Sequence, residues 1–78
     1  MKKLEIMTEL GLYLGRKSIN KAEISRKTGI SASRLSELTL NDGAHLRAKE
    51  LYLIALAMDV APCDLLNALF KNVELSRS

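Results

Sequence analysis

Short hydroxyl, cationic and carboxylate side chains gather in one stretch, residues 31–37, with the sequence SASRLSE. Hydroxyl and guanidinium groups can donate hydrogen bonds to phosphate oxygens or base edges, and an alanine methyl can contact thymine. The stretch contains no pair of nucleophile and base and no set of metal ligands. Its chemistry therefore favours non-covalent binding of a polyanion.

Catalysis and metal binding find little support elsewhere in the chain. His45 is the single histidine and Cys63 the single cysteine, and they are eighteen residues apart on different expected elements. No glycine-rich phosphate loop is present. We expect no catalytic residue, no metal site and no cofactor, and therefore no enzyme.

Two short helices joined by a tight turn would position the polar stretch. Asn20 is a good N-cap, and Glu23 can reach back to complete a capping box, so a helix is expected to begin at about Lys21. Gly29 can adopt the left-handed conformation at little steric cost. The first helix is therefore expected to stop there in a sharp turn.

The second of these helices is expected to start after Ser31, a second N-cap residue, and to run to about Thr39. Its apolar side chains Leu35 and Leu38, three residues apart, would face the core. The candidate reading surface is the opposite side, which carries Ser33, Ser36, Glu37 and Leu40, with Ala32 and Arg34 on its flanks.

Residues 21–40, KAEISRKTGISASRLSELTL, resemble the helix-turn-helix of the Cro and phage-repressor (Xre-like) family of transcriptional regulators. Residues 49–66, KELYLIALAMDVAPCDLL, are similar to that family's fourth helix and the start of its fifth. The resemblance covers roughly residues 4–70. It implies an all-α, compact, five-helix, lambda-repressor-like DNA-binding domain. Helices 2 and 3 would form the helix-turn-helix, with the helix from Ser31 in the major groove of double-stranded DNA.

Length and composition agree with a small helical protein. Seventy-eight residues make one domain, 1–78, with residues 73–78 expected to form a frayed tail. The hydrophobic fraction of 47% suffices for a packed core, and one proline with four glycines argues against disorder. No strand-length alternation of apolar and polar residues occurs, which predicts an all-α fold.

Five helices are expected along the chain. The first runs from about Lys2 to Tyr13 or Gly15, and its apolar stripe begins with Ile6 and Met7. Residues 41–43, Asn-Asp-Gly, predict a turn before a fourth helix over about 47–58. Because residues 51–58 are all apolar, that helix is expected to be surrounded on every side. The fifth should start at Pro62 and continue through Phe70 towards Val73.

Membrane insertion and export are not expected. The apolar run of residues 51–58 is far too short to span a bilayer. Lys2 and Lys3 are not followed by an uninterrupted apolar stretch, as a signal peptide would require. We expect a cytoplasmic protein with no membrane partner.

Positive charge is concentrated around the candidate reading surface. Residues 16–49 contain eight basic and three acidic residues, whereas the rest of the chain carries four basic and six acidic ones. This segregation favours neutralisation of nucleic-acid phosphates over the simpler reading that the cations only solvate the surface.

The DNA contacts implied by the resemblance each have an alternative. Lys21 would meet a phosphate or extend into solvent, and Ser31 would cap its helix or also donate outward. For Arg34, a phosphate or guanine contact is favoured over an ion pair with Glu37 or Glu23. Glu37 departs from the basic or amide residue of many relatives. The full set of expected contacts is Lys21, Ser31, Ala32, Ser33, Arg34, Ser36, Glu37, Asn41, His45 and Arg47, with turn formation the stronger alternative for Asn41.

The sequence thus predicts a regulator that binds double-stranded DNA sequence-specifically. The alternative is a protein-interaction module, such as a partner-binding antitoxin-like component, that keeps the fold without using the reading surface. A homodimer is also expected, because one small unit covers too little DNA. Its interface would use Leu66, Phe70 and Val73, unless these side chains instead close the core of the monomer.

Overall fold

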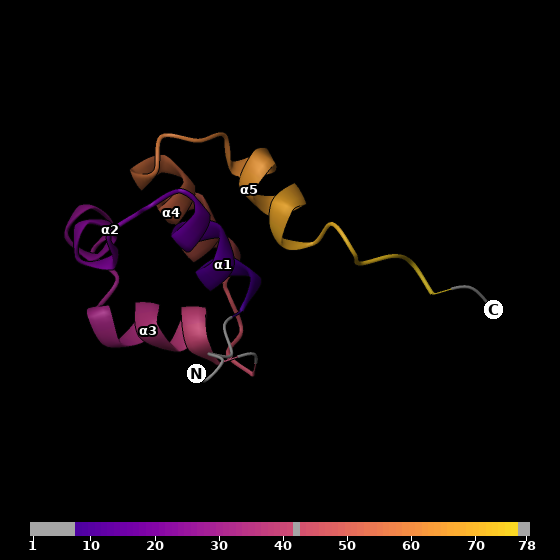
Figure 1. Ribbon diagram of the computed structural model, residues 1–78, viewed down its shortest axis with the longest axis horizontal. Coiled ribbons are helices and arrows are strands. Elements are labelled where there is room, and N and C mark those ends of the chain that lie inside the picture. Colours follow the sequence, from indigo (N-terminus) through magenta and orange to yellow (C-terminus); the bar gives the residue numbers. More distant parts are fainter. Residues whose placement is uncertain (1–7, 42, 77–78) are drawn as a thin grey trace.

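The computed structural model describes residues 8–41 and 43–76, which contain five α-helices and no strand. The helices are α1 (Glu9–Arg16), α2 (Lys21–Thr28), α3 (Ala32–Leu40), α4 (Ala48–Ala57) and α5 (Pro62–Leu69) (Figure 1). The prediction of an all-α fold is confirmed. The first helix is expected to run from about Lys2, but Thr8 is extended and caps it, so α1 begins at Glu9. Ile6 and Met7 of the expected apolar stripe and Asp42 of the expected turn lie outside the described residues.

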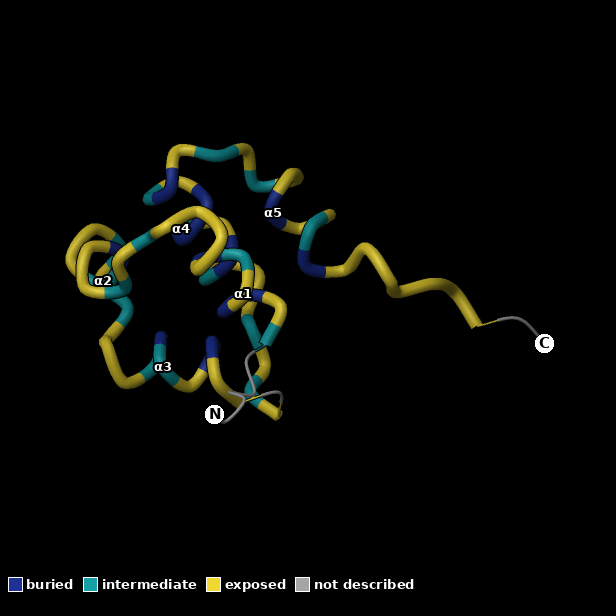
Figure 2. The backbone as a smooth tube through the Cα atoms, in the orientation of Figure 1, coloured by how far each residue is buried: buried dark blue, intermediate teal, exposed yellow. Residues whose placement is uncertain are grey.

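A single core joins the five helices. Its large, fully buried side chains include Ile24, Leu35, Ile54 and Leu65, each at most 1% exposed. The burial of one such side chain contributes about 1.5–3 kcal/mol to folding. The remaining core members come from α1, α3, α4, α5 and the residue after α4, and they are Leu10, Leu14, Leu38, Leu51, Ala55, Met58 and Leu69. The buried residues of α3 lie on the side that faces the other helices (Figure 2).

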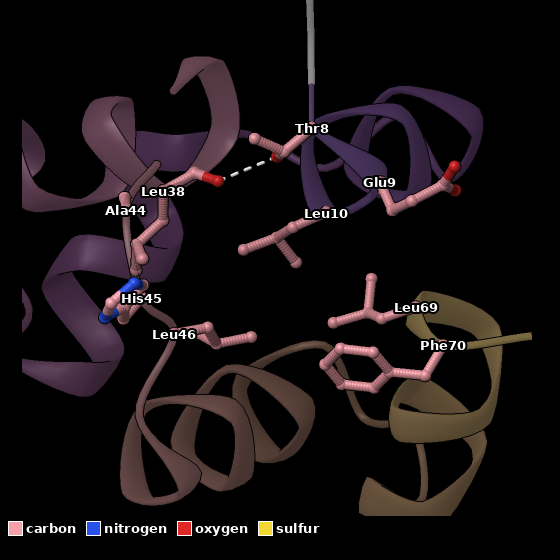
Figure 3. Close-up of a pocket in the computed structure, with 9 residues that line it drawn as sticks. All are labelled: Thr8, Glu9, Leu10, Leu38, Ala44, His45, Leu46, Leu69 and Phe70. Atoms are coloured by element: carbon pink, nitrogen blue, oxygen red, sulfur yellow. Dashed lines mark hydrogen bonds between the residues drawn. The ribbon is translucent and has the colours of Figure 1, made fainter. Parts of the chain in front are cut away.

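Thr8 ties the start of α1 to the end of α3. Its hydroxyl donates to the carbonyl of Leu38 at 2.7 Å (Figure 3) and accepts from the backbone N–H of Gly11 at 3.1 Å. Its own backbone N–H donates to the carbonyl of Thr39 at 2.9 Å. One residue therefore caps α1 and satisfies two carbonyls in the last turn of α3.

The expectation that the fourth helix is surrounded on every side is wrong. Leu51, Ile54 and Ala55 are buried, but Tyr52 and Leu56 are each 54% exposed. α4 packs against α2 and α5, which leaves its remaining side open to solvent. An uninterrupted apolar run does not show how many neighbours a helix has, because neighbours depend on the path of the chain.

The fifth helix begins as expected but ends early. Pro62 occupies its first turn, and Leu65 and Leu69 are buried. The helix ends at Leu69, and residues 73–76 are exposed and non-helical (Figure 1). Val73 therefore does not continue the helical stripe of Leu66 and Phe70, because beyond Leu69 the chain has left the core.

Within the described residues, no single helix has both the length and the apolar character needed to cross a bilayer. Only α4 and α5 taken together meet that requirement, and they are bent by 117° relative to each other.

Candidate nucleic-acid interface

The turn between α2 and α3 is built by hydroxyl groups of α2. Gly29 has a φ of 81° and ends α2 in the left-handed conformation, as predicted. The Ser25 hydroxyl donates to the carbonyl of Ile30 at 2.7 Å. The Thr28 hydroxyl donates to the carbonyl of Ile24 at 2.7 Å and accepts from the N–H of Ile30 at 3.0 Å. Both backbone groups of Ile30 are thus bound by α2, which fixes the direction in which α3 departs.

The predicted N-caps are confirmed, but the predicted capping box is not. Asn20 accepts from the N–H of Ala22 at 2.8 Å, and Ser31 accepts from the N–H three residues later at 3.1 Å. The Glu23 carboxylate does not reach back to Asn20 but pairs with Arg26. A hydrogen bond and the charge of Arg26 hold the pKa of Glu23 below its ordinary value. At this exposed position the cation one turn away competes successfully for the carboxylate.

α3 has a buried and an exposed side, as the spacing predicted. Leu35 and Leu38 are buried, and Thr39, whose burial the spacing did not predict, is only 2% exposed. The opposite surface, which we call the outer face, comprises Ala32, Ser33, Ser36, Glu37 and Leu40. All of these are exposed except Ser36, which is half-buried.

Arg34 is turned towards the start of α4. Its Nε and Nη2 donate to the two carboxylate oxygens of Glu50 at 2.8 and 3.0 Å. Nη2 also donates to the carbonyl of His45 at 2.7 Å, and Nη1 to Glu37 at 3.1 Å. These bonds use four of the five N–H donors of the guanidinium. The ion pair that the sequence left as the weaker alternative is therefore present, although Glu50 is its main partner and Glu23 takes no part.

Glu50 is a site residue that sequence reasoning missed. Its side chain is 13% exposed, and it also accepts from the backbone N–H of Arg47 at 2.9 Å, at the start of α4. The hydrogen bond from Arg34 lowers the pKa of Glu50, burial opposes this, and the bond from Arg47 lowers it further. The pKa of Arg34 is raised by the same pairing. The one local signal was the position of Glu50 in the third residue of its helix, where carboxylates often bind the capping N–H.

The cations around the outer face are mostly free of ion pairs. Of the eight basic residues between 16 and 49, ion pairs within the described residues involve Arg26 and Arg34. Lys21 lies with its Nζ 3.5 Å from the Thr39 hydroxyl and is half-buried. Exposed cations precede and follow α3 in the chain: Arg16, Lys17, Arg26, Lys27, Arg47 and Lys49.

The loop after α3 contains three predicted contact residues. The side-chain oxygen of Asn41 accepts from the N–H of Gly43 at 2.8 Å, so Asn41 forms the turn, as its alternative reading proposed. His45 and Arg47 are exposed. The bond from Arg34 to the His45 carbonyl holds this loop beside α3.

A cavity of about 400 Å³ lies between the start of α1, the loop after α3 and the end of α5 (Figure 3). Its lining is mainly apolar, with Leu10, Leu46, Leu69 and Phe70 among its residues. Within the described part of the chain, no group of three or more metal-binding side chains occurs there or elsewhere.

The residues expected at a dimer interface lie on the surface. Leu66 is 46% exposed, Phe70 48% and Val73 68%. They do not close the core of the monomer, whose C-terminal part is formed by Leu65 and Leu69.

Comparison with known proteins gives one match, to a family model, and it spans all the residues described above as the candidate nucleic-acid interface. The family model of the Cro/C1-type HTH DNA-binding domain matches residues 9–71, a range that includes all of α1 to α5. No curated protein and no solved structure gives a significant match.

Proposed function

This chain belongs to the Cro/C1-type helix-turn-helix DNA-binding domain family, and we propose on that premise that it is a sequence-specific transcriptional regulator with α3 in the major groove. The observation that carries the proposal is the exposed outer face of α3, whose other side is buried in the core. As part of the same proposal, the protein acts without catalysis and in the cytoplasm, beside the DNA that it binds.

The dimensions and charge of this region support the proposal. The nine residues of α3 form a helix about 13 Å long. The major groove, which is about 12 Å wide, can accommodate the diameter of an α-helix. Exposed cations on α2 and at the start of α4 can neutralise phosphates on either side of the groove.

The proposed contacts fall into two groups. Base edges would be met by the outer face, namely Ala32, Ser33, Ser36, Glu37 and Leu40. The phosphate backbone would be met by Lys21, Asn41, His45 and Arg47, and by the hydroxyl of Ser31 while it caps α3. Arg34, most of whose donors are already bound, would position α3 instead of binding DNA directly.

Salt dependence and one matched pair of variants test this function. Binding of the full chain to a pool of random duplexes should weaken steeply as salt rises, by about 0.9 logarithmic units per phosphate contact per tenfold change in salt. Ser33→Glu should abolish binding, because it adds bulk and negative charge to the outer face. Ala61→Glu, an exposed position just before α5 that belongs to neither the outer face nor the proposed dimer interface, should bind like the wild type.

The pair is informative only if both variants keep their helical circular dichroism. Wild-type binding that does not respond to salt, or unchanged binding by Ser33→Glu, would contradict the assigned surface.

A second candidate function is favoured by one specific observation. Tyr52 and Leu56 expose an apolar side of α4, which would suit a protein partner. In such an interaction module the outer face would stay unused, and binding of the partner would be nearly independent of salt.

A homodimer is part of the main proposal. The exposed Leu66, Phe70 and Val73 support it, because they offer apolar surface that the monomer core does not need. Two copies could then place their α3 helices in successive major grooves about 34 Å apart.

A further inference from the structure

We infer that α3 reads thymine methyl groups and not guanine edges. This inference rests on the proposed function and deepens it by naming the base chemistry that the outer face recognises. On α3 the single cation is bound to Glu50, no amide side chain is present, and apolar side chains are exposed on the outer face.

Arg34 is the one basic residue of α3. Guanine is read best by an arginine or lysine that donates to its N7 and O6 together. The Nε and Nη2 groups of Arg34, which could donate two parallel hydrogen bonds to a base, donate to Glu50 instead. To release Arg34 towards DNA would leave the Glu50 carboxylate, 13% exposed, without its cation. Guanine therefore lacks its usual partner on this helix.

α3 also lacks the side chains that read adenine best. Adenine is read through N6 and N7 by the side chain of asparagine or glutamine. The sequence of α3, ASRLSELTL, contains neither residue. A hydroxyl can make one of these bonds but not the pair, so adenine also lacks a bidentate partner.

Apart from the Glu37 carboxylate, which accepts from Arg34, the remaining groups of the outer face are methyls and hydroxyls. Leu40 is 47% exposed, although its neighbours Leu38 and Thr39 are buried, so the core does not explain a leucine there. Ala32, Ser36 and Leu40 follow one another at intervals of four residues and share one side of the helix. The apolar group that a base pair offers in the major groove is the C5 methyl of thymine. Ala32 and Leu40 can make apolar contacts with that methyl group.

The spacing of the two apolar residues gives the pattern to expect. Eight residues of helix separate Ala32 and Leu40 by about 12 Å, which corresponds to about three to four base-pair steps. Each half-site should therefore carry two thymine methyls at about that separation, with Ser36 facing the base edges between them.

The test replaces thymine with uracil, which removes the C5 methyl alone. Duplexes that the full-length wild-type chain selects from a random pool are resynthesised with uracil at each thymine in turn. The wild type should lose about fourfold in affinity at each contacted thymine, the value expected for one buried methyl group. Leu40→Ala should weaken binding to the thymine duplex and should no longer distinguish uracil at the thymine that Leu40 contacts.

The control is Leu56→Ala, a leucine of similar exposure on α4, which should retain the full preference for thymine. Equal wild-type affinity for thymine and uracil duplexes would overturn the inference while leaving DNA binding intact. A full thymine preference in Leu40→Ala would overturn the role of Leu40. Failure of the wild type to select any duplex would instead overturn the proposed function, so the two failures can be told apart.

Discussion

Arg34, Glu37 and Glu50 give α3 a charge arrangement unlike that of a simple basic helix. The Arg34 guanidinium is bound to both carboxylates, and the three side chains together carry one net negative charge. The exposed cations on the neighbouring segments must then supply the attraction to phosphates. Glu50 could not be assigned to this group from the sequence, because it is sixteen residues from Arg34 and meets it only through the path of the loop.

Glu37→Gln should strengthen binding to DNA. The carboxylate is exposed on the outer face, and its removal relieves repulsion from phosphates of about 1 kcal/mol at close range in water, or about fivefold in affinity. The gain should shrink as salt screens the charge. Fluorescence anisotropy with a labelled duplex at two salt concentrations measures it, with Asp64→Asn on α5 as the control. Weaker binding would mean that the carboxylate accepts a hydrogen bond from a base.

Glu50→Gln should destabilise the protein at neutral pH by about 1–2 kcal/mol, because the charge-assisted bonds from Arg34 are lost. The folded-state pKa of Glu50 is lowered, so its contribution is present above its ordinary pKa of 4.5 and is lost as pH falls through the lower folded value. The wild type and the variant should therefore converge in stability in acid. Urea unfolding as a function of pH measures this, with Glu74→Gln in the exposed tail as the control. A constant difference down to pH values below the folded pKa would contradict the pairing.

Most helix boundaries that are set by a local capping residue could be predicted, whereas boundaries and surroundings that are set by packing could not. Asn20, Ser31 and Pro62 act on backbone groups within three residues, so the local sequence is sufficient to place them. The end of α5 at Leu69 and the exposure of Tyr52 depend on which helices pack together, which the local sequence does not contain. The same limit applies to the site: the outer face of α3 could be predicted from its period, whereas the orientation of Arg34 could not.

Two glycine substitutions should have opposite effects on stability. Gly29→Ala should cost about 1 kcal/mol, because φ is 81° and an L-residue is strained there although no atom lies within 4 Å of the added Cβ. Gly15→Ala also meets no atom within 4 Å, but it lies inside α1 with an ordinary backbone, so it should stabilise by about 0.5–1 kcal/mol. Thermal unfolding of both variants gives the comparison. A stabilised Gly29→Ala would contradict the glycine-dependent turn.

The two surfaces to which we assign functions lie on different parts of the molecule. The outer face belongs to α3, whereas the exposed apolar residue Leu66 lies on α5 and Phe70 directly follows that helix, which packs on α1 and α4. A second copy bound at α5 would therefore leave the α3 surface available to DNA. Family membership could be inferred from the turn residues and the spacing of apolar positions, but self-association depends on an exposed surface that only the packed molecule reveals.

Phe70→Glu should abolish self-association. It places a charge in the proposed apolar interface at a position that is 48% exposed, so folding should be little affected. Sedimentation velocity at micromolar concentration should show a dimer for the wild type and a monomer for the variant. Lys27→Glu makes a larger change in charge on α2, away from α5, and should remain dimeric. A monomeric wild type would rule out the proposed interface at that concentration.

The bonds that fix α3 leave its outer side chains free to vary. The turn is held by hydroxyls of α2, and the last turn is held by Thr8 through backbone carbonyls. None of these attachments uses the side chain of Ser33, Ser36 or Leu40. Those three positions can consequently be randomised together in a combinatorial library, and new operators could be sought on an unchanged scaffold.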